Sequence, residues 1–494
     1  MRLLAKLEKS SQFWFLLLTS FFFFILRLPS LFEPYWYGDE GIYQVLGVAM
    51  NNGRLLYRDI WDNKPPLLYF LYSIFNSDQF YVRLFSLIVG LLSVYAFYYL
   101  SRKLFNNQKA VFWATGIYAL LFGLPLLEGN IANAENFMLL PTIFAAALLL
   151  KNSNERIRSM KYKLEILAGF FVGIAFLFKI VAVFDFAAFL VFIGLTDENF
   201  SLVNLLKPKK FLEEIKKFLP FIVSFIFPIG LTALLFLFKG AFYYFIKASF
   251  FANVGYVGYG NTLIIPQGFL ILKLLILTLF CLFVYLRRKH VDKAFIFIFI
   301  WFAFSLFNSF FAQRPYTHYL LNLLPSFSLL VGYIFYNKKL KEFSIIVILI
   351  TLILVVKNFW LYGKFPFYYT NFISFLSGAE SVSKYQAFFD RGTPPTYEVA
   401  AYINANTNKD DSIFLWGNNA MLYKLTDKLP PGKYAVAYHI GWYPDGVSNT
   451  KAALALKKPK FIVIMPNVGP IPLSLVNYKE KISIDNILIY ERVL

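Results

Sequence analysis

Long apolar runs recur along this chain, and they restrict its fold more than any other feature. Hydrophobic residues make up 59% of its 494 residues and charged residues 15%, whereas soluble domains average roughly 45–50% apolar and about 25% charged residues. One soluble core cannot bury 60 Phe and 33 Tyr side chains. The composition therefore predicts an integral membrane protein.

Eleven runs approach the length of about 20 residues that crosses a bilayer as a helix. The predicted spans are 12–32, 79–100, 110–127, 134–150, 164–180, 182–196, 218–238, 267–287, 294–312, 318–336 and 343–362. The fifth and sixth together are too long for one helix and short for two, which predicts a tight bend near Lys179. The first run has no small-residue cleavage site after it, so we expect an uncleaved span rather than a signal peptide.

Basic residues mark alternate loops between these runs, and cytoplasmic loops carry the excess of Lys and Arg. The basic segments are the N-terminus (Arg2, Lys6, Lys9), 102–109, 151–163, 207–217, 287–293 and 338–341. The pattern predicts a multi-pass plasma-membrane protein with a cytoplasmic N-terminus. It places 33–72 and everything after residue 363 outside. A net charge of +20 spread over short loops disfavours nucleic-acid binding, which needs one basic patch.

The composition changes near residue 363. Residues 390–494 are predicted to form a small extracytoplasmic α/β domain, joined by a linker at 363–389 to the membrane domain at 1–362. Residues 396–405 have helical periodicity, and 412–417 and 459–465 are typical of buried strands. The last two apolar segments flank Asp485 and Asn486, which favours a terminal hairpin.

Residues 33–78 form the first outer loop, and its part 33–72 is unusually rich in ionisable side chains for a loop between apolar runs. Asp39 and Glu40 come shortly after the first span, where a carboxylate can take a proton from an attacking hydroxyl. A solvated acidic pair is the alternative. Lys64 precedes Pro65 and Pro66, which fix the backbone. That lysine is suited to bind a phosphate or to extend its amine to the membrane surface.

Ionisable residues also occur in or beside the later spans, where a charge is costly and usually has a partner. Glu135, at the outer start of the fourth span, is a second candidate acid, with Glu128 weaker. Glu135 could instead complement the dipole of the helix at whose start it lies. Lys179 lies among apolar residues and is a candidate for binding a lipid phosphate. Lys179 could instead form an ion pair with Asp185.

The predicted outer turn at 312–325 holds Arg314, His318 and Tyr319, and an Arg–His pair can hold a phosphate. Elsewhere, the single cysteine, Cys281, and three histidines form no zinc-binding spacing. Gly255, Gly258 and Gly260 are interpreted as a flexible loop rather than a nucleotide-binding turn. We therefore predict neither a metal site nor another cofactor, and the sequence does not support a nucleotide-sugar donor.

Five segments in order are similar to the C-type (GT-C) membrane glycosyltransferases, within the protein O-mannosyltransferase and aminoarabinose-transferase group. They are YGDEGIY, LYRDIWDNKPPL, NIANAENFMLLP, GIAFLFK and RPYTHYLLNLLP. The resemblance covers roughly residues 1–360. It implies a polyprenyl-phosphate sugar donor, an active site at the outer face and inversion at the anomeric carbon.

By position, the resemblance gives Asp39 the role of the catalytic carboxylate, beside Glu40, and Glu135 that of a second acid. Lys64 matches the lysine before the proline, Lys179 matches the lysine that contacts the lipid phosphate, and His318 and Tyr319 resemble a late motif of the group. Some relatives have an acidic metal-site residue directly before the first lysine. This chain has Asn63 there, which puts metal dependence in doubt.

These features together predict an α-helical polytopic protein with about eleven spans that transfers a sugar to a lipid, glycan or protein acceptor at the membrane. Two rivals stay open. A flippase or transporter for lipid-linked sugars would carry polar groups near the midplane of many spans. A non-enzymatic surface-assembly protein would leave the charged first loop without an explanation.

Overall fold

The computed structural model describes residues 11–152, 158–253, 270–312, 314, 316–466 and 468–493. The predicted glycine loop at Gly255, Gly258 and Gly260 lies outside the described residues, as do the basic residues Arg2, Lys6, Lys9 and Arg156. The chain divides into two compact units. We call Met1–Leu28, Phe85–Leu235 and Phe251–Phe365 the bundle unit, and Pro29–Leu84, Phe236–Phe250 and Pro366–Leu494 the sheet unit.

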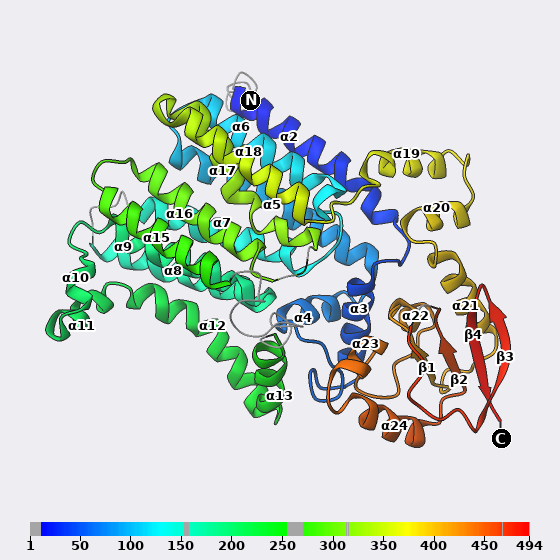
Figure 1. Cartoon of the computed structure of the whole chain (residues 1–494). Helices are drawn as coiled ribbons and strands as arrows, with labels where there is room; N and C mark the ends of the chain where they lie inside the picture. Colours follow the sequence, from blue (N-terminus) through cyan, green and yellow to red (C-terminus); the bar gives the residue numbers. More distant parts are fainter. Residues whose placement is uncertain are drawn as a thin grey trace, which may run out of the picture. The chain divides into compact units, whose positions relative to one another are not determined.

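Apolar helices packed side by side form the bundle unit (Figure 1). They are α2 (Ser11–Arg27), most of α5 (Gln79–Leu104), α6 (Gln108–Gly123), α7 (Ala134–Asn152), α8 (Arg158–Phe178), α9 (Val183–Thr196), α12 (Leu219–Phe238), α15 (Leu270–Arg287), α16 (Lys293–Ser309), α17 (Leu324–Tyr336) and α18 (Lys341–Asn358). The shorter α10 (Leu202–Leu205) and α11 (Pro208–Lys216) connect α9 to α12. Each predicted span overlaps a helix.

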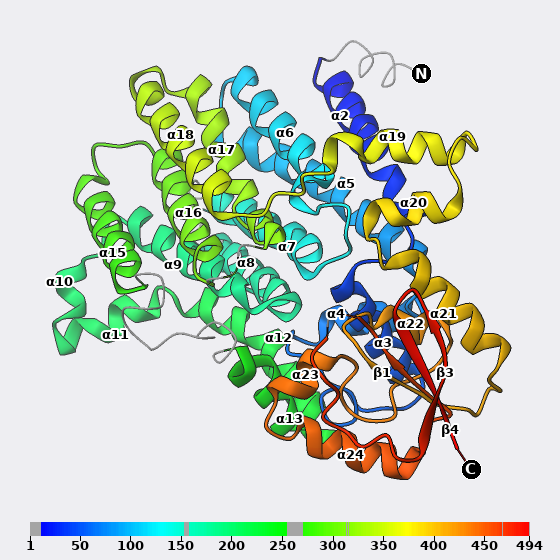
Figure 2. The ribbon, with the colours of Figure 1, turned by 45° about the vertical axis from the view of Figure 1, so that its right-hand side comes forward.

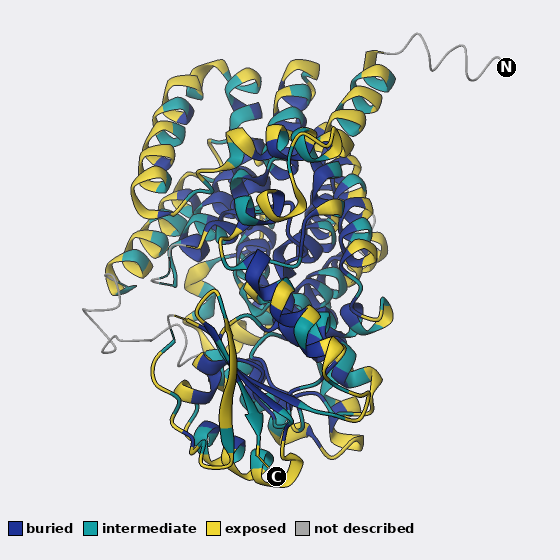
Figure 3. Ribbon diagram, turned by 90° about the vertical axis from the view of Figure 1, so that its right-hand side faces the viewer, coloured by how far each residue is buried: buried dark blue, intermediate teal, exposed yellow. Residues whose placement is uncertain are grey.

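Five of the described helical segments are long and apolar enough to cross a membrane: Ser11–Phe32, Gln79–Leu104, Ala134–Lys151, Leu219–Phe238 and Leu270–Arg287. Three shorter apolar helices are Ile180–Thr196, Lys293–Ser309 and Leu324–Tyr336. Large apolar side chains are exposed along the outer helices of the bundle unit (Figure 3), as expected where lipid is the solvent. The chain is a multi-pass membrane protein, and the predicted polytopic helical fold is confirmed.

Small residues let neighbouring helices approach closely, a common device in membrane bundles. Gly169 and Gly173 lie on one face of α8, and a Cβ at either position would collide with the backbone of Phe221 or Phe225 in α12. The bend predicted near Lys179 is also present. The helix α8 ends at Phe178, Lys179 is extended, and the short 3₁₀ helix η3 (Ile180–Ala182) leads into α9.

The sheet unit holds a four-stranded mixed sheet in the order β1-β2-β4-β3. β1 (Ile413–Trp416) and β2 (Phe461–Ile464) are parallel, whereas β4 (Ile487–Arg492) pairs antiparallel with both β2 and β3 (Tyr478–Ile484). Both predicted buried strands are confirmed. The predicted hairpin is confirmed as well, because Asp485 and Asn486 turn with φ of 46° and 66°, a left-handed conformation that Asp and Asn tolerate.

Helices complete the sheet unit (Figure 2). From the first loop come α3 (Gly38–Asn51) and α4 (Leu67–Ile74), and α13 (Phe242–Ile246) follows α12. The C-terminal part adds α19 (Phe365–Leu376), α20 (Val382–Phe389), α21 (Thr393–Ala405), α22 (Met421–Leu425), α23 (Ala437–Trp442) and α24 (Gly446–Lys457). Gly41 of α3 lies so close to the backbone of Met421 that a Cβ would not fit. The first loop and the C-terminal residues therefore fold as one body.

Candidate active site

The first cluster of polar groups surrounds Asp39, in the first turn of α3. The hydroxyl of Tyr43, one turn later, donates a hydrogen bond of 3.0 Å to Asp39 Oδ2. The amine of Lys64 lies 3.4 Å from the same oxygen and 4.8 Å from the centre of the Tyr43 ring. The Asp39 side chain is 34% exposed. It is thus a fixed carboxylate that a substrate can reach.

Lys64 is held in this place by its backbone as well as by its amine. The Tyr57 hydroxyl donates to Lys64 O at 2.7 Å, and Lys64 N–H donates to the Tyr69 hydroxyl at 3.2 Å. Tyr57 is buried and has φ of 68°, a conformation that costs a bulky residue energy and is enriched at functional sites. Burial raises the pKa of both tyrosines well above the usual value, so both hydroxyls keep their protons.

Asp62 adds a buried carboxylate to this cluster. It is buried, accepts hydrogen bonds from the Tyr69 hydroxyl at 2.7 Å and from Asn63 N–H at 2.8 Å, and lies 3.7 Å from the Lys64 amine. The Nε2 atom of His439, on α23, lies 3.7 Å from Asp62 Oδ1. His439 is not among the site residues predicted from the sequence. We call Asp39, Tyr43, Asp62, Lys64, Tyr69 and His439 the Asp39 cluster.

The burial of His439 predicts how the stability of the protein changes with pH. Burial, with a smaller contribution from Lys64, lowers the pKa of His439 to about 4, below the value of about 6.5 for an unfolded chain. The unfolded state therefore takes up a proton first as the pH falls from 6.5 to 4, and the folded state loses stability by about 3 kcal/mol over that range. We expect His439→Gln to lose less stability on acidification than the native protein, measured by thermal unfolding at both pH values.

The matched control is His290→Gln, because His290 is exposed and its replacement is expected to leave the acid-induced loss unchanged. If His439→Gln lost as much stability between pH 6.5 and pH 4 as the native protein does, His439 would not be the buried neutral group described here.

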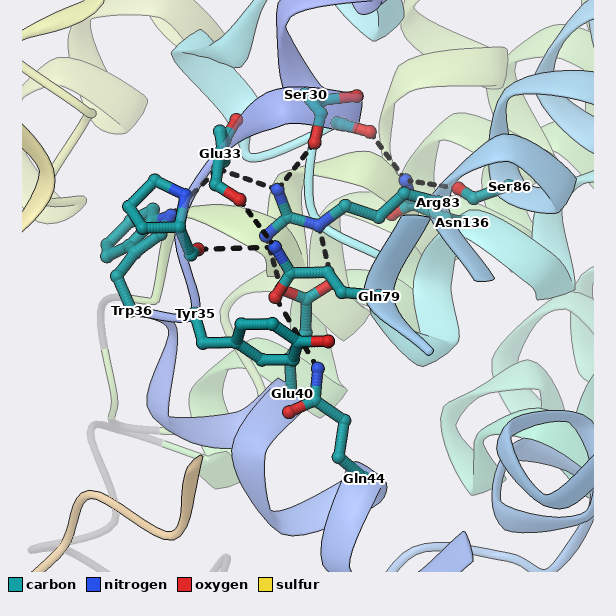
Figure 4. A network of polar contacts seen from close by, with 12 residues as sticks. Ser30, Glu33, Tyr35, Trp36, Glu40, Gln44, Gln79, Arg83, Ser86 and Asn136 are labelled. Atoms are coloured by element: carbon teal, nitrogen blue, oxygen red, sulfur yellow. Dashed lines mark hydrogen bonds and ion pairs between the residues drawn. The ribbon is translucent and has the colours of Figure 1, made fainter. Parts of the chain in front are cut away.

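Glu40 has surroundings different from those of Asp39 (Figure 4). Its buried carboxylate pairs with the guanidinium of Arg83, whose Nε donates to Glu40 Oε1 at 3.1 Å. Arg83 also lies 2.9 Å from Glu33 and donates to Ser30 O at 2.8 Å. The Tyr368 hydroxyl donates to the second oxygen of Glu33 at 2.5 Å. Glu40 thus belongs to a buried ionic network behind α3, whereas Asp39 faces the half-exposed side.

A second cluster lies in the bundle unit, at the start of α7. Glu135 is buried there and pairs with the largely buried amine of Lys179. That amine lies 4.5 Å from the centre of the Tyr319 ring. The His318 ring lies 3.8 Å from Glu135 through Nε2 and 2.9 Å from Glu128 through Nδ1. We call Glu128, Glu135, Lys179, His318 and Tyr319 the Glu135 cluster.

The bundle unit thus brings together residues predicted from separate loops. Asp185, the alternative partner of Lys179, instead accepts a hydrogen bond of 2.7 Å from Trp301 Nε1. Arg314 is half-buried in the turn after α16, four residues before His318. In the described part of the chain, no group of three or more His, Cys, Asp or Glu side chains is arranged to hold a metal ion. The expectation that no metal takes part stays a prediction.

Comparisons with known proteins identify the fold that carries these two clusters. Residues 63–227 match the family model for dolichyl-phosphate-mannose-protein mannosyltransferase, a range that contains Lys64, Glu135 and Lys179. No curated protein sequence matches the chain. The apo structure of ArnT from Cupriavidus metallidurans superposes with a TM-score of 0.55 at 14% identity, covering 97% of this chain and 98% of ArnT. The chain has a GT-C fold.

Two further structures agree with the GT-C fold. The undecaprenyl phosphate complex of the same ArnT has a TM-score of 0.52 at 13% identity, with coverage of 97% and 98%. The apo oligosaccharyltransferase of Archaeoglobus fulgidus has a TM-score of 0.50 at 14% identity, covering 92% of this chain and 69% of that one. The resemblance found in the sequence motifs is confirmed. At these identities the structures establish the fold alone.

Proposed function

We propose that this protein is an inverting glycosyltransferase that moves a sugar from a polyprenyl-phosphate donor to a hydroxyl of a cell-envelope lipid, glycan or protein. The observation that carries the proposal is the Asp39 cluster, in which Tyr43 and Lys64 hold one accessible carboxylate within a GT-C fold. The ArnT structure bound to undecaprenyl phosphate supports a donor of this class. The proposed site faces the outside, with the N-terminus in the cytoplasm.

The proposed step is a single displacement. The acceptor oxygen attacks the anomeric carbon while Asp39 takes its proton. The bond from that carbon to the phosphate oxygen breaks, and its electron pair stays on the polyprenyl phosphate. A phosphate is already a good leaving group, so the main needs are a general base and cations that stabilise the developing charge. The Lys64 amine lies 3.4 Å from Asp39 Oδ2 and helps to hold that carboxylate in position.

Glu40 takes a positioning role in this proposal rather than a chemical one, because Arg83 and burial separate it from any acceptor. Its ion pair fixes the first turn of α3, and Asp39 is the preceding residue in that turn. Both carboxylates were predicted from the sequence to be catalytic. We retain Asp39 for proton transfer.

The Glu135 cluster is proposed to bind the donor phosphate through Lys179, His318 and Tyr319, together with Arg314, which lies four residues before His318 in the sequence. Lys179 now pairs with Glu135, and the His318 ring lies beside Glu128. A phosphate can replace or join a carboxylate as the anionic partner of Lys179. Glu135 then holds Lys179 in place in a largely apolar surrounding. The second acid predicted from the sequence is thus proposed to orient a cation.

Replacing Lys179 with Gln is expected to raise the apparent KM for the lipid donor by about tenfold, the effect of losing one charge-assisted contact to a phosphate. The control is Lys273→Gln. Lys273 is also in an apolar helix, and its amine donates to Phe310 O at 2.7 Å. Donor titrations in liposomes measure both variants. Equal KM values for Lys179→Gln and the native enzyme would remove Lys179 from donor binding.

The experiment that tests the proposed function is sugar transfer by the purified protein in liposomes. A panel of radiolabelled polyprenyl-phosphate sugars is supplied with cell-envelope fractions, and label is followed into acceptor lipid, glycan and protein. We expect label to move from at least one donor to one acceptor class. Transfer from no member of a panel that includes hexoses, pentoses and aminopentoses would contradict the proposal.

A further inference from the structure

The helix α19 has no charged residue in its sequence FPFYYTNFISFL, and Thr370 is the only one of its polar residues that is exposed. Its inner face joins a buried aromatic cluster formed by Tyr368, Phe372, Tyr385 and Phe389. Its outer face presents Phe367, Ile373 and Leu376, which are 65%, 63% and 61% exposed. A soluble helix places polar residues on such a face. The outer face of α19 is therefore suited to an apolar medium.

The contacts of α19 locate it at the end of a membrane span. The Phe372 ring packs 5.6 Å from that of Phe32, and Phe32 is the last residue of the apolar segment Ser11–Phe32. The hydroxyl of Tyr385, on α20, donates to Phe32 O at 3.4 Å. A helix packed on the final residue of a span lies where hydrocarbon gives way to headgroups. Lys364 directly precedes the helix, as is common at this level.

We propose that α19 is an interfacial helix that rests on the bilayer, with Phe367, Ile373 and Leu376 in the boundary between headgroups and acyl chains. A lipid surface is a better occupant than a protein partner, because this part of the chain packs on Phe32, the last residue of an apolar segment of membrane length. Burial of large apolar side chains in this layer is the usual source of affinity of such helices.

The inner face of α19 connects this docking to the proposed site through Tyr368, and Figure 4 shows the Glu33, Arg83 and Glu40 part of that connection. Tyr368 donates to Glu33, Glu33 pairs with Arg83, and Arg83 pairs with Glu40. The Trp36 indole also donates to Glu33 at 2.7 Å. Since Glu40 adjoins Asp39 in α3, contact between α19 and lipid sets the depth of Asp39 at the membrane. This second part of the inference rests on the proposed function.

The docking is tested without any sugar donor. In a Cys281→Ser background, which leaves no other cysteine, the variants Phe367→Cys and Ile373→Cys are labelled with an environment-sensitive nitrobenzoxadiazole dye. The proteins are placed in phosphatidylcholine–phosphatidylglycerol vesicles that contain lipids spin-labelled near the headgroup. The control is Lys384→Cys on α20, whose side chain is 71% exposed. We expect quenching several-fold stronger at residues 367 and 373 than at 384. Equal quenching at all three would overturn the docking.

The connection to the site is tested by Ile373→Glu, which places a charge at the proposed lipid contact without altering the inner face. We expect turnover to fall by about tenfold, since charge at this depth is costly, while Lys384→Glu keeps the native rate. Strong quenching with native turnover in Ile373→Glu would support the docking and overturn its link to the site. Failure of sugar transfer in the native protein would leave the quenching result intact, so the two proposals fail separately.

Discussion

Asp39→Asn is expected to lower sugar transfer by about 10²–10⁴-fold, the typical contribution of a positioned general base. Asparagine keeps the size and can still accept a hydrogen bond from Tyr43, whose hydroxyl now lies 3.0 Å from the carboxylate. It cannot take up the acceptor's proton. The fold should persist, because the side chain is 34% exposed. Turnover of saturating donor in liposomes measures the loss.

The matched control for this substitution is Asp59→Asn. Asp59 belongs to the same loop, is 33% exposed and pairs with the guanidinium of the neighbouring residue Arg58 at 2.7 Å. Its replacement removes one carboxylate of equal accessibility, and we expect a rate close to native. If the Asp39→Asn and Asp59→Asn variants transferred sugar at equal rates, Asp39 would not be the general base. The Asp39 cluster would then be a structural feature of the first loop.

Arg83→Met is expected to produce the largest loss of stability. The change leaves the carboxylates of Glu33 and Glu40 buried without their cation. Removal of one partner from a buried ionic group typically costs about 3–5 kcal/mol, and here two carboxylates lose the same partner. The thermal unfolding temperature of the detergent-solubilised protein should fall clearly, and turnover should fall with it because α3 carries Asp39.

Arg102→Met, at the other end of the same helix α5, is the control for helix propensity and loss of charge. Arg102 is exposed and donates to Gln12 Oε1 at 2.9 Å, so its loss should cost less than about 1 kcal/mol. Similar unfolding temperatures for the two variants would show that the Arg83 network contributes little to stability.

Much of the fold was predictable because its signals are local. Apolar runs of membrane length are visible without knowledge of tertiary contacts, and each of the eleven overlaps a helix. The break at Lys179 followed from the length of one apolar stretch, and the terminal hairpin from the turn chemistry of Asp485 and Asn486. The motifs that resemble the GT-C group were equally local, and the fold agrees with them.

The candidate site was less predictable because its contacts join distant residues. Asp39 and Glu40 are neighbours in sequence, but successive residues of a helix point about 100° apart, so one reaches Lys64 and the other Arg83. Lys179 pairs with Glu135, 44 residues away, rather than with nearby Asp185. His439 approaches Asp62 from α23, and nothing near either residue in the sequence indicates their contact.

The fate of the donor in sealed proteoliposomes tests the central claim most directly. A polyprenyl-phosphate sugar carrying label in both sugar and phosphate is supplied on the side of the C-terminal residues, together with acceptor. We predict that the sugar label joins the acceptor, that polyprenyl phosphate retains the other label, and that Asp39→Asn slows this separation by at least about a hundredfold. Movement of the intact doubly labelled lipid between leaflets, with the two labels never separating, would contradict the account and identify a flippase.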